Sequence, residues 1–378
     1  MDSVALNAAE FARYQRHLIM PEFNLAAQLA LKNAKVLVVG AGGLGAPLLQ
    51  YLAAAGVGHI GIVDYDRIEV SNLQRQVLFA QDDVGKYKAE VAKDKIVAQN
   101  PHIRVDAITD KLTSENALDI IKPYDIVADG TDNFPTRYLV NDACFLLQKI
   151  NVFGSIFRFE GQLAVFNYPL KDGQRSANYR DIFPEPPVPG MVPNCAEAGV
   201  LGVLPGIVGS MQANEVIKVI TSIGEPLVNK LLVFDALSYS FHNLKIKTQK
   251  DNPLSGENPS INSLIDYEAF CGITANDEFI NIKSISSGEF NQLKTDGLDF
   301  QLIDVREKSE FDLFNIGGLF APLSDLVSYI DQIDRNKKVI VHCQSGKRSR
   351  QAIELLQRDF GFSNLINLEG GLNSVEVG

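Results

Sequence analysis

The chain has 378 residues, 46% of them hydrophobic and 21% charged, and its formal net charge is −11. This length exceeds what one ordinary core requires, so we expect a soluble globular protein of two domains, or three. Phosphate contacts need clustered Lys and Arg, and this acidic chain has only one short basic run, at residues 346–350. Neither nucleic acid nor a membrane is therefore expected as a partner.

The N-terminus and the cysteines indicate the cellular compartment. The first residues contain no basic region followed by an apolar run, so no signal peptide is expected. The longest uncharged stretch, residues 198–214, is too short and too polar for a membrane span. The cysteines form no CxxC pair, so neither a disulfide framework nor a four-cysteine zinc site is signalled. We expect a cytoplasmic protein with four single cysteines, Cys144, Cys195, Cys271 and Cys343.

Predicted strands and helices alternate along the first part of the chain. Residues 35–40 form an apolar run that ends in glycine, which is typical of a buried parallel strand. Helices are predicted at residues 46–55 and 86–99, and strands at residues 60–64, 125–128, 151–156, 163–168 and 231–235. This alternation predicts an α/β fold with a Rossmann-like, mostly parallel sheet and antiparallel additions.

Two segments interrupt this pattern. Five prolines lie between residues 183 and 193, so we expect an exposed, semi-extended loop there. Residues 248–262 are polar and rich in Asn, Ser, Pro and Gly, which marks an interdomain linker. We therefore predict a first domain at residues 1–250, a linker at 251–277, and a smaller α/β domain at 278–378 with buried strands at 300–305 and 339–343.

The first predicted strand leads into a glycine-rich turn that fits the pattern GxGxxG. Its glycines let phosphates approach bare backbone N–H groups at a helix N-terminus, and Asp64, at the end of the next strand, can bond ribose hydroxyls. Alone, this turn favours NAD first, and a turn without any ligand stays open as the alternative. The glycines concerned are Gly40, Gly42, Gly43 and Gly45.

Polar residues that follow Asp64 favour ATP instead. Splitting ATP between its α and β phosphates builds negative charge on pyrophosphate, which Arg, Lys and a carboxylate-held Mg²⁺ can stabilise. Each candidate residue alone could be a surface charge or a turn residue, but together they indicate an ATP site. They are Asn72, Arg75, Lys88 and Asp132, within the segments 71–76, 85–88 and 129–133.

Over residues 10–247 the sequence resembles the MoeB/ThiF/HesA family, the ubiquitin-activating-like adenylyltransferases that act on molybdopterin-synthase and thiamine sulfur carriers. The resemblance rests on several ordered motifs: Arg13-Tyr14-Gln15-Arg16, the glycine turn, Asp64-Tyr65-Asp66, Ser71-Asn72-Leu73-Gln74-Arg75-Gln76, Thr131-Asp132-Asn133, Glu160-Gly161-Gln162 and Cys195-Ala196-Glu197-Ala198-Gly199-Val200.

This resemblance implies a homodimer with one nucleotide site in each half. It assigns the ribose to Asp64 and the Mg²⁺ to Asp132, and it implies that Arg16 reaches a phosphate in the site of the other subunit. It implies that Asn72, Arg75 and Lys88 bind the phosphates. Ser71 and Asn133 are also expected among the nucleotide-binding residues. The Gly-Gly tail of the carrier would lie under the proline-rich loop, with its carboxylate attacking the α-phosphate.

One departure from the family concerns zinc. Many members hold a structural zinc with two CxxC pairs, but here the first region is Ala177-Asn178-Tyr179-Arg180-Asp181, without cysteine, and the second retains only Cys271. A structural zinc needs four ligands, which one thiolate cannot supply. We therefore predict ATP and Mg²⁺ as cofactors and no structural zinc.

A second cysteine motif lies near the C-terminus. Residues 341–349 place Cys343 at the end of a buried strand, before a loop whose N–H groups and cations, Lys347 and Arg348, favour a thiolate. This loop resembles the rhodanese active site, and residues 302–311 resemble the rhodanese opening motif, within a resemblance that covers about residues 278–374. Four residues separate Cys343 from Arg348, whereas phosphatase loops have five, so persulfide sulfur is favoured over phosphate as the cargo.

Together the two resemblances imply adenylation of the Gly-Gly carboxylate of a ubiquitin-like sulfur carrier, followed by persulfide transfer to give a thiocarboxylate. The persulfide donor would be a cysteine desulfurase or thiosulfate. The predicted catalytic residues are Arg75, Asp132, Cys343, Arg348 and Cys195, and for Cys195 a packing role stays equally open.

Two other functions remain as alternatives. The first is an NAD-dependent oxidoreductase, which the glycine turn alone would also suit. The second is a non-catalytic scaffold that binds ubiquitin-like proteins, but such a scaffold is expected to lack Arg75, Lys88 or Asp132, and all three are present.

Overall fold

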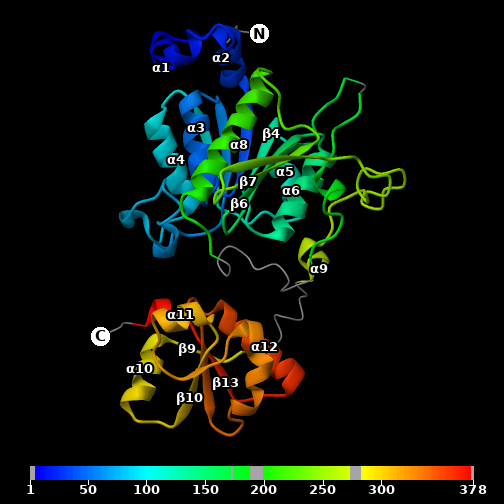
Figure 1. The fold of residues 1–378 in the computed structure, drawn as a ribbon. Coiled ribbons are helices and arrows are strands. Elements are labelled where there is room, and N and C mark those ends of the chain that lie inside the picture. Colours follow the sequence, from blue (N-terminus) through cyan, green and yellow to red (C-terminus); the bar gives the residue numbers. More distant parts are fainter. Residues whose placement is uncertain (1–4, 172, 188–198, 273–281, 376–378) are drawn as a thin grey trace. The chain divides into compact units, whose positions relative to one another are not determined.

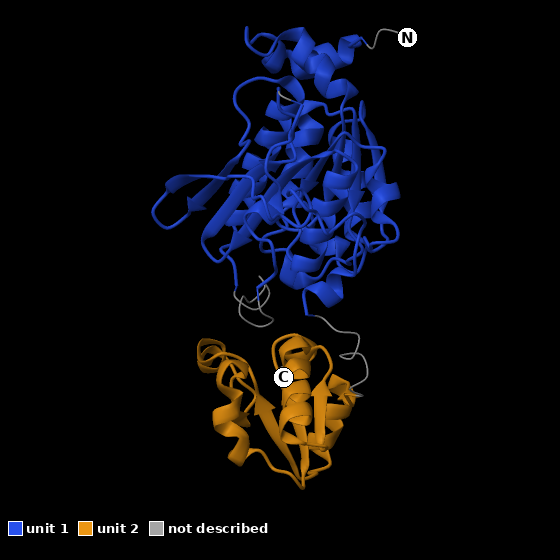
Figure 2. Cartoon of the chain, turned by 90° about the vertical axis from the view of Figure 1, so that its right-hand side faces the viewer, with its two compact units in different colours: residues 1–273 blue, residues 274–378 orange. Residues whose placement is uncertain are grey.

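The computed structural model describes residues 5–171, 173–187, 199–272 and 282–375 (Figure 1). The chain divides into two units, residues 1–273 and 274–378 (Figure 2). Within the described ranges, no helix combines the length and the apolar character that a membrane crossing requires.

The first unit is built on an eight-stranded sheet with the strand order β3-β2-β1-β4-β5-β6-β7-β8. The first five strands in this order are parallel, and the last three are added antiparallel, so the predicted Rossmann-like sheet with antiparallel additions is confirmed. The strands are β1 (Lys35–Val39), β2 (His59–Val63), β3 (Arg104–Ile108), β4 (Ile126–Asp129), β5 (Ile150–Phe157), β6 (Glu160–Phe166), β7 (Lys230–Asp235) and β8 (Ser240–Lys245).

Helices cover both faces of this sheet because its central strands are apolar on both sides. On β1, Val36 and Val38 belong to one core cluster, and Leu37 and Val39 belong to the other. The first cluster includes residues of α2, α3, α4 and α8, and the second includes residues of α5 and α6. The helices are α1 (Ala8–Leu18), α2 (Asn24–Asn33), α3 (Gly45–Ala55), α4 (Lys88–Gln99), α5 (Ala117–Ile121), α6 (Phe134–Leu146), α8 (Leu204–Thr221), α9 (Tyr267–Phe270), and the 3₁₀ turns η1 (Val70–Asn72), η2 (Gln81–Asp83) and η3 (Tyr179–Asp181).

Much of the predicted linker is packed onto the first unit. Leu254 and Tyr267 are only 2% and 4% exposed, and α9 packs against α6. These buried side chains are spaced too irregularly to stand out within a polar segment. The rest of the predicted linker, residues 273–277, lies outside the described residues, as do residues 278–281 at the predicted start of the second domain.

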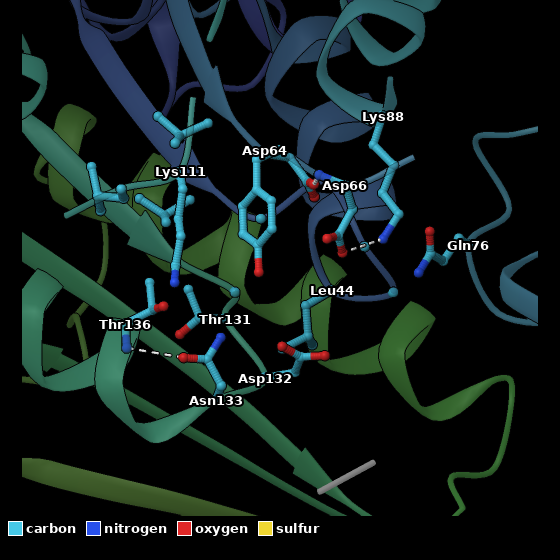
Figure 3. Close-up of a pocket in the computed structure, with 18 of the residues that line it drawn as sticks. Leu44, Asp64, Asp66, Gln76, Lys88, Lys111, Thr131, Asp132, Asn133 and Thr136 are labelled. Atoms are coloured by element: carbon cyan, nitrogen blue, oxygen red, sulfur yellow. Dashed lines mark hydrogen bonds and ion pairs between the residues drawn. The ribbon is translucent and has the colours of Figure 1, made fainter. Parts of the chain in front are cut away.

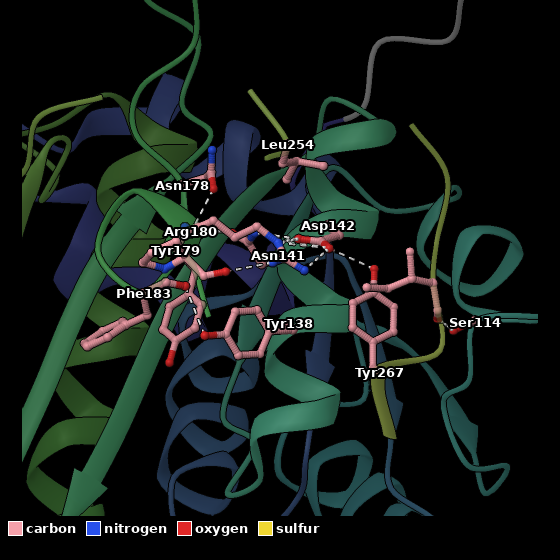
Figure 4. A network of polar contacts seen from close by, with 12 residues as sticks. Ser114, Tyr138, Asn141, Asp142, Asn178, Tyr179, Arg180, Phe183, Leu254 and Tyr267 are labelled. Atoms are coloured by element: carbon pink, nitrogen blue, oxygen red, sulfur yellow. Dashed lines mark hydrogen bonds and ion pairs between the residues drawn. The ribbon is translucent and has the colours of Figure 1, made fainter. Parts of the chain in front are cut away.

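A buried polar network holds this region together (Figure 4). The guanidinium of Arg180, on η3, donates to both carboxylate oxygens of Asp142, on α6, at 2.8–3.2 Å, and both side chains are fully buried. The hydroxyl of Tyr267, on α9, donates to the same carboxylate at 2.9 Å. The Arg180 guanidinium also donates to the carbonyl oxygen of Pro184, at the start of the proline-rich segment. The network therefore joins three segments that are far apart in the sequence.

The second unit contains a five-stranded parallel sheet with the strand order β11-β10-β12-β13-β9. Its core includes Ile303 and Val341 on adjacent strands and Leu356 on α12. The elements are β9 (Ser284–Ile285), α10 (Ser287–Thr295), β10 (Phe300–Asp304), α11 (Lys308–Leu313), β11 (Leu319–Phe320), η5 (Leu323–Gln332), β12 (Lys338–His342), α12 (Lys347–Phe360), β13 (Leu365–Leu368) and η6 (Gly371–Ser374).

Candidate active sites

A pocket opens in the first unit at the carboxyl ends of β1, β2 and β4 (Figure 3). The strand order reverses between β1 and β4, and parallel α/β sheets bind ligands at such a point. The lining residues come from the glycine turn, the segments after β2, β3 and β4, and the start of α4. They include Gly40, Gly42, Gly43, Asp64, Tyr65, Asp66, Arg75, Gln76, Lys88, Lys111, Leu112, Thr131, Asp132 and Asn133.

The glycine turn is shaped by close backbone contacts. Gly40 has a φ of +93°, which only glycine adopts readily. A Cβ on Gly45 would lie 2.0 Å from the carbonyl oxygen of Gly40, so this position cannot carry a side chain. Gly45 begins α3 and does not line the pocket, in contrast to the other three glycines. Its role here is to let the helix approach the strand, which leaves the N-terminus of α3 directed at the pocket.

Asp64 is fixed by two backbone N–H groups. Its carboxylate oxygens accept hydrogen bonds from Ala41 at 2.8 Å and from Asp66 at 2.9 Å. Burial raises the pKa of Asp64, although the charge of Lys88 and the two N–H groups oppose this effect. The carboxylate is thereby held in the pocket wall in a single orientation, as a ribose hydroxyl ligand requires.

Three cationic side chains line the pocket. The Nζ of Lys88 lies 2.9 Å from the carboxylate of Asp66, and this lysine side chain is only 8% exposed. Arg75 is half-buried and donates to the carbonyl oxygen of Ser71 at 3.1 Å. The third cation, Lys111, was missed by the sequence analysis because the preceding strand, β3, was not predicted. Its position three residues after the end of a strand is the signal that would have indicated it.

Besides Gly45, three predicted nucleotide-binding residues are absent from the pocket lining. Asn72 and Ser71 make local contacts with Glu69: Asn72 accepts a hydrogen bond from the Glu69 N–H at 3.1 Å, and the Ser71 hydroxyl donates to the Glu69 carboxylate at 3.2 Å. Neither residue lines the pocket. Arg16 is exposed on α1 and does not line the pocket of its own chain, so its predicted reach into the site of another subunit stays a prediction.

The loop after β4 presents Asp132 to the pocket. Beneath it, Asp129 is fully buried and accepts hydrogen bonds from the N–H and hydroxyl of Thr131 at 3.0 and 2.7 Å. Burial raises the pKa of Asp129. Arg137 supports the same loop by donating to the Thr131 carbonyl oxygen at 3.1 Å, and Asn133 caps α6 through the N–H of residue 136 at 3.0 Å. The loop is thus rigidly held while Asp132 itself is exposed.

The donor set of the pocket suits magnesium that arrives with a nucleotide. Mg²⁺ prefers oxygen ligands and is usually bound by one or two carboxylates together with substrate phosphates. Asp132 supplies such a carboxylate, and the described residues contain no group of three or more His, Cys, Asp or Glu that could hold a metal alone. The residues present therefore fit Mg²⁺ bound jointly by Asp132 and phosphate.

In the second unit, Cys343 lies between β12 and the N-terminus of α12. The N–H of Gly346 donates to its Sγ at 3.1 Å, and the hydroxyl of Ser349 lies 3.7 Å from the same atom. Gly346 has a φ of +85°, which lets the loop turn back over the sulfur. The predicted N–H donor and the Ser349 hydroxyl therefore converge on this sulfur, and Cys343 is fully buried under the loop.

The two cations of this loop differ in environment. The guanidinium of Arg348 makes a two-fold ion pair with Glu310 on α11, at 2.6 and 2.7 Å, whereas Lys347 is exposed. Burial alone would raise the pKa of Glu310, but the hydrogen bonds and the charge of Arg348 lower it. Arg306, paired with the buried Asp304, also donates to Gln344 in the loop at 3.3 Å. The rhodanese-like opening motif and the cysteine loop are therefore in direct contact.

The other cysteines have different surroundings. Cys144 is fully buried in the core of the first unit, and burial raises its pKa well above the ordinary value. Cys271 is 9% exposed, and burial raises the pKa of its thiol to about 11. Cys195 lies outside the described residues, as does the second half of the proline-rich loop.

These two sites define a class: an adenylating α/β enzyme that carries a sulfurtransferase domain. The ThiF family model matches residues 14–255, and the rhodanese-like domain model matches residues 286–376. The chain belongs to the ThiF family and has a C-terminal rhodanese-like domain.

Two relatives that align with 97% of this chain are named for both activities. The chain is 47% identical to "Probable adenylyltransferase/sulfurtransferase MoeZ" of Mycobacterium tuberculosis (strain ATCC 25618 / H37Rv), over 97% of this chain and 93% of that protein. It is 41% identical to "Adenylyltransferase and sulfurtransferase MOCS3" of Drosophila sechellia, over 97% and 83% of the two chains. These relatives confirm the enzyme class that the sequence predicted.

Two further comparisons concern the first unit. The chain is 55% identical to "Sulfur carrier protein adenylyltransferase" of Thermus thermophilus, over 70% of this chain and 97% of that protein. The crystal structure of E. coli MccB with AMPCPP and MccA superposes with a TM-score of 0.57 at 25% identity, covering 67% of this chain and 75% of that one. About two thirds of this chain therefore has the same fold as this solved structure.

Proposed function

We propose that this enzyme uses Mg-ATP to adenylate the C-terminal Gly-Gly carboxylate of a ubiquitin-like sulfur carrier and then converts that carboxylate to a thiocarboxylate with sulfur from Cys343. The observation that carries the first half is one pocket lined by Arg75, Lys88 and Lys111 together with Asp132 and the glycine turn. A nicotinamide would need no such set of cations, whereas a departing pyrophosphate does. The names of the relatives support the choice of a sulfur carrier as substrate.

The first step joins the carrier carboxylate to the α-phosphate of ATP and breaks the bond to the β-phosphate, so that pyrophosphate leaves. The N–H groups of the glycine turn and the side chains of Arg75 and Lys88 offset the charge that builds on the phosphates. Bound Mg²⁺, held by Asp132, would supply further neutralisation of that charge. The step is needed because a carboxylate is a poor electrophile, and the mixed anhydride makes AMP a workable leaving group.

The second step attaches sulfur to the activated carbonyl. The outer sulfur of a Cys343 persulfide attacks the acyl carbon and AMP leaves, which gives an acyl disulfide between the carrier and Cys343. A thiol must then attack that disulfide to release the thiocarboxylate, and Cys195 is our candidate for this thiol. The resulting disulfide is reduced by a cellular dithiol before the next cycle.

Several finer points complete the proposal. The carrier would belong to the molybdopterin-synthase branch, to the thiamine branch, or to both, and the persulfide donor would be a cysteine desulfurase or thiosulfate. We propose a cytoplasmic homodimer in which Arg16 completes the nucleotide site of the other subunit, with no structural zinc. The last point is supported by the ligand set, because Cys271 alone cannot supply the four ligands of a structural zinc.

The decisive experiment measures ATP–pyrophosphate exchange driven by a Gly-Gly-tailed carrier. Arg75→Ala and Asp132→Ala should abolish the exchange, whereas Cys343→Ser should keep it and lose only thiocarboxylate formation, which mass spectrometry of the carrier detects. Exchange that survives unchanged in both pocket variants would refute the adenylation site. A melting temperature raised by NAD but not by ATP or AMP would favour an oxidoreductase, and a protein that binds carriers without any exchange would favour the scaffold.

A further inference from the structure

A long-range ion pair stands at the edge of the nucleotide pocket. The Nζ of Lys111 lies 2.6 Å from Oε1 of Glu268, a residue 157 positions later in the chain. Lys111 lines the pocket, and Figure 3 shows its side chain extending toward Thr131 and Asn133. Glu268 lies on α9, which contributes no residue to the pocket lining. One partner of this cation therefore comes from outside the pocket lining.

Glu268 is carried on a segment with its own anchors. The hydroxyl of Tyr267 donates to Asp142 at 2.9 Å, and the hydroxyl of Ser114 donates to the carbonyl oxygen of Ile265. The carboxylate of Asp266 caps α9 by accepting the N–H of Glu268 at 3.1 Å. The backbone leading into Glu268 is thus fixed, which keeps this carboxylate beside the side chain of Lys111.

The pair is suited to positioning a cation that binds a ligand. Both side chains are 53% exposed, so the ammonium stands at the mouth of the pocket and is accessible to an incoming molecule. An ammonium has three N–H donors, so a contact with Glu268 does not exclude a contact with a nucleotide. The deeper Lys88 is held in the same way by Asp66, but that acid is itself a pocket residue.

We propose that Lys111 contacts the bound nucleotide and that Glu268 is its positioning residue. The segment at residues 264–272, after which the chain continues to the second unit, is then a working part of the nucleotide site. This inference rests on the proposed binding of ATP in the pocket. Because coupling between two sites is reciprocal, a nucleotide that gains affinity from α9 must stabilise α9 by the same factor.

The test compares ATP affinity in Lys111→Ala, Glu268→Gln and the double variant. An exposed ion pair contributes modestly, so Glu268→Gln should raise the dissociation constant and the KM for ATP about two- to five-fold and leave kcat unchanged. Lys111→Ala should have the larger effect, and the double variant should match Lys111→Ala because Glu268 acts only through that lysine. Lys111→Arg, which keeps the charge, should restore most of the affinity.

A matched control is available on the same C-terminal stretch. Lys250 and Glu257 form an exposed ion pair of 2.9 Å, and neither residue lines the nucleotide pocket. Glu257→Gln should therefore leave the affinity for ATP unchanged. In the wild type, ATP should also slow amide hydrogen exchange at residues 265–270, and Lys111→Ala should remove this protection.

Each other outcome overturns the inference. If Glu268→Gln binds ATP as the wild type does, Glu268 positions nothing, and if it binds ATP more tightly, the pair competes with the nucleotide instead of supporting it. Wild-type affinity is measured first and separately. If the wild type binds no ATP, the proposed function fails together with this inference, whereas normal wild-type binding with unaffected variants refutes the inference alone.

Discussion

The buried pair of Arg180 and Asp142 gives the sharpest prediction on stability. Asp142→Asn keeps the shape of the side chain but leaves the fully buried guanidinium of Arg180 without its countercharge. Removing one partner of a buried ion pair costs about 3–5 kcal/mol, and the remaining amide oxygen places this variant near the lower value. Domains are stable by only about 5–15 kcal/mol, so the loss is a large share of the total.

The assay is thermal unfolding monitored by differential scanning calorimetry. For a unit of this size, 1 kcal/mol shifts the melting temperature by about 2–4 °C, so a loss near 3 kcal/mol in Asp142→Asn should lower the transition of the first unit by about 6–12 °C. The transition of the second unit should not move and serves as an internal standard. Asp312→Asn breaks an exposed ion pair with Lys308 in the second unit and should lower the melting temperature of that unit only slightly.

A double variant separates charge from packing. Replacing both partners by apolar residues, as in Asp142→Leu with Arg180→Met, removes the buried charges together and should recover part of the lost stability. The recovery should be incomplete because Tyr267 then loses its hydrogen-bond acceptor. A first-unit transition lowered by less than about 2 °C in Asp142→Asn would contradict the reasoning, since that shift is typical of an exposed pair.

Three further predictions concern the two sites. Gly45→Ala should abolish ATP binding in calorimetric titration, because its Cβ would lie 2.0 Å from the Gly40 carbonyl oxygen, whereas Gly206→Ala, with no atom within 4 Å of the new Cβ, should retain it. Chelation by EDTA should stop ATP–pyrophosphate exchange until Mg²⁺ is added, without affecting persulfide loading of Cys343; exchange that persists in EDTA would argue against the ion at Asp132. Burial lowers the pKa of His342 to about 4 in the folded protein, whereas its ordinary value is 6.5. As the pH falls below 6.5, a proton therefore binds to His342 in the unfolded chain before it binds in the folded one. The second unit should therefore lose about 2 kcal/mol of stability between pH 7 and pH 5, and His342→Gln should remove this part of the pH dependence in urea titrations.

Sequence motifs predicted most of the site residues that lie within a few residues of the end of a strand. Strands β1, β2 and β4 were found because each is a short apolar run that ends at a polar or glycine-rich turn. The glycine turn, Asp64 and the loop at Asp132 followed from these strands, since carboxyl ends of parallel strands meet at one edge of the sheet. The cysteine loop was predictable for the same reason, because β12 and α12 flank it directly.

Other parts were not accessible to this kind of reasoning. Strand β3 has the sequence RVDAI, in which two of five residues are charged, because an edge strand is covered less completely than a central one. The role of Arg180 depends on Asp142, which lies 38 positions away on another element. A fully buried arginine looks like surface charge in a sequence until its partner is located.

Two failures of prediction have one physical cause. The missed strand β3 hid Lys111, and the polar composition of residues 251–272 hid the folded segment that carries Glu268. Each feature is marginal alone: β3 is a half-polar edge strand, and α9 has only four residues. Each lies in contact with distant parts of the chain. Examples are the ion pair between Lys111, which follows β3, and Glu268 on α9, and the hydrogen bond from Tyr267 to Asp142. Segments stabilised in this way respond to changes at their partners, which is why amide exchange at residues 265–270 should depend on whether ATP fills the pocket.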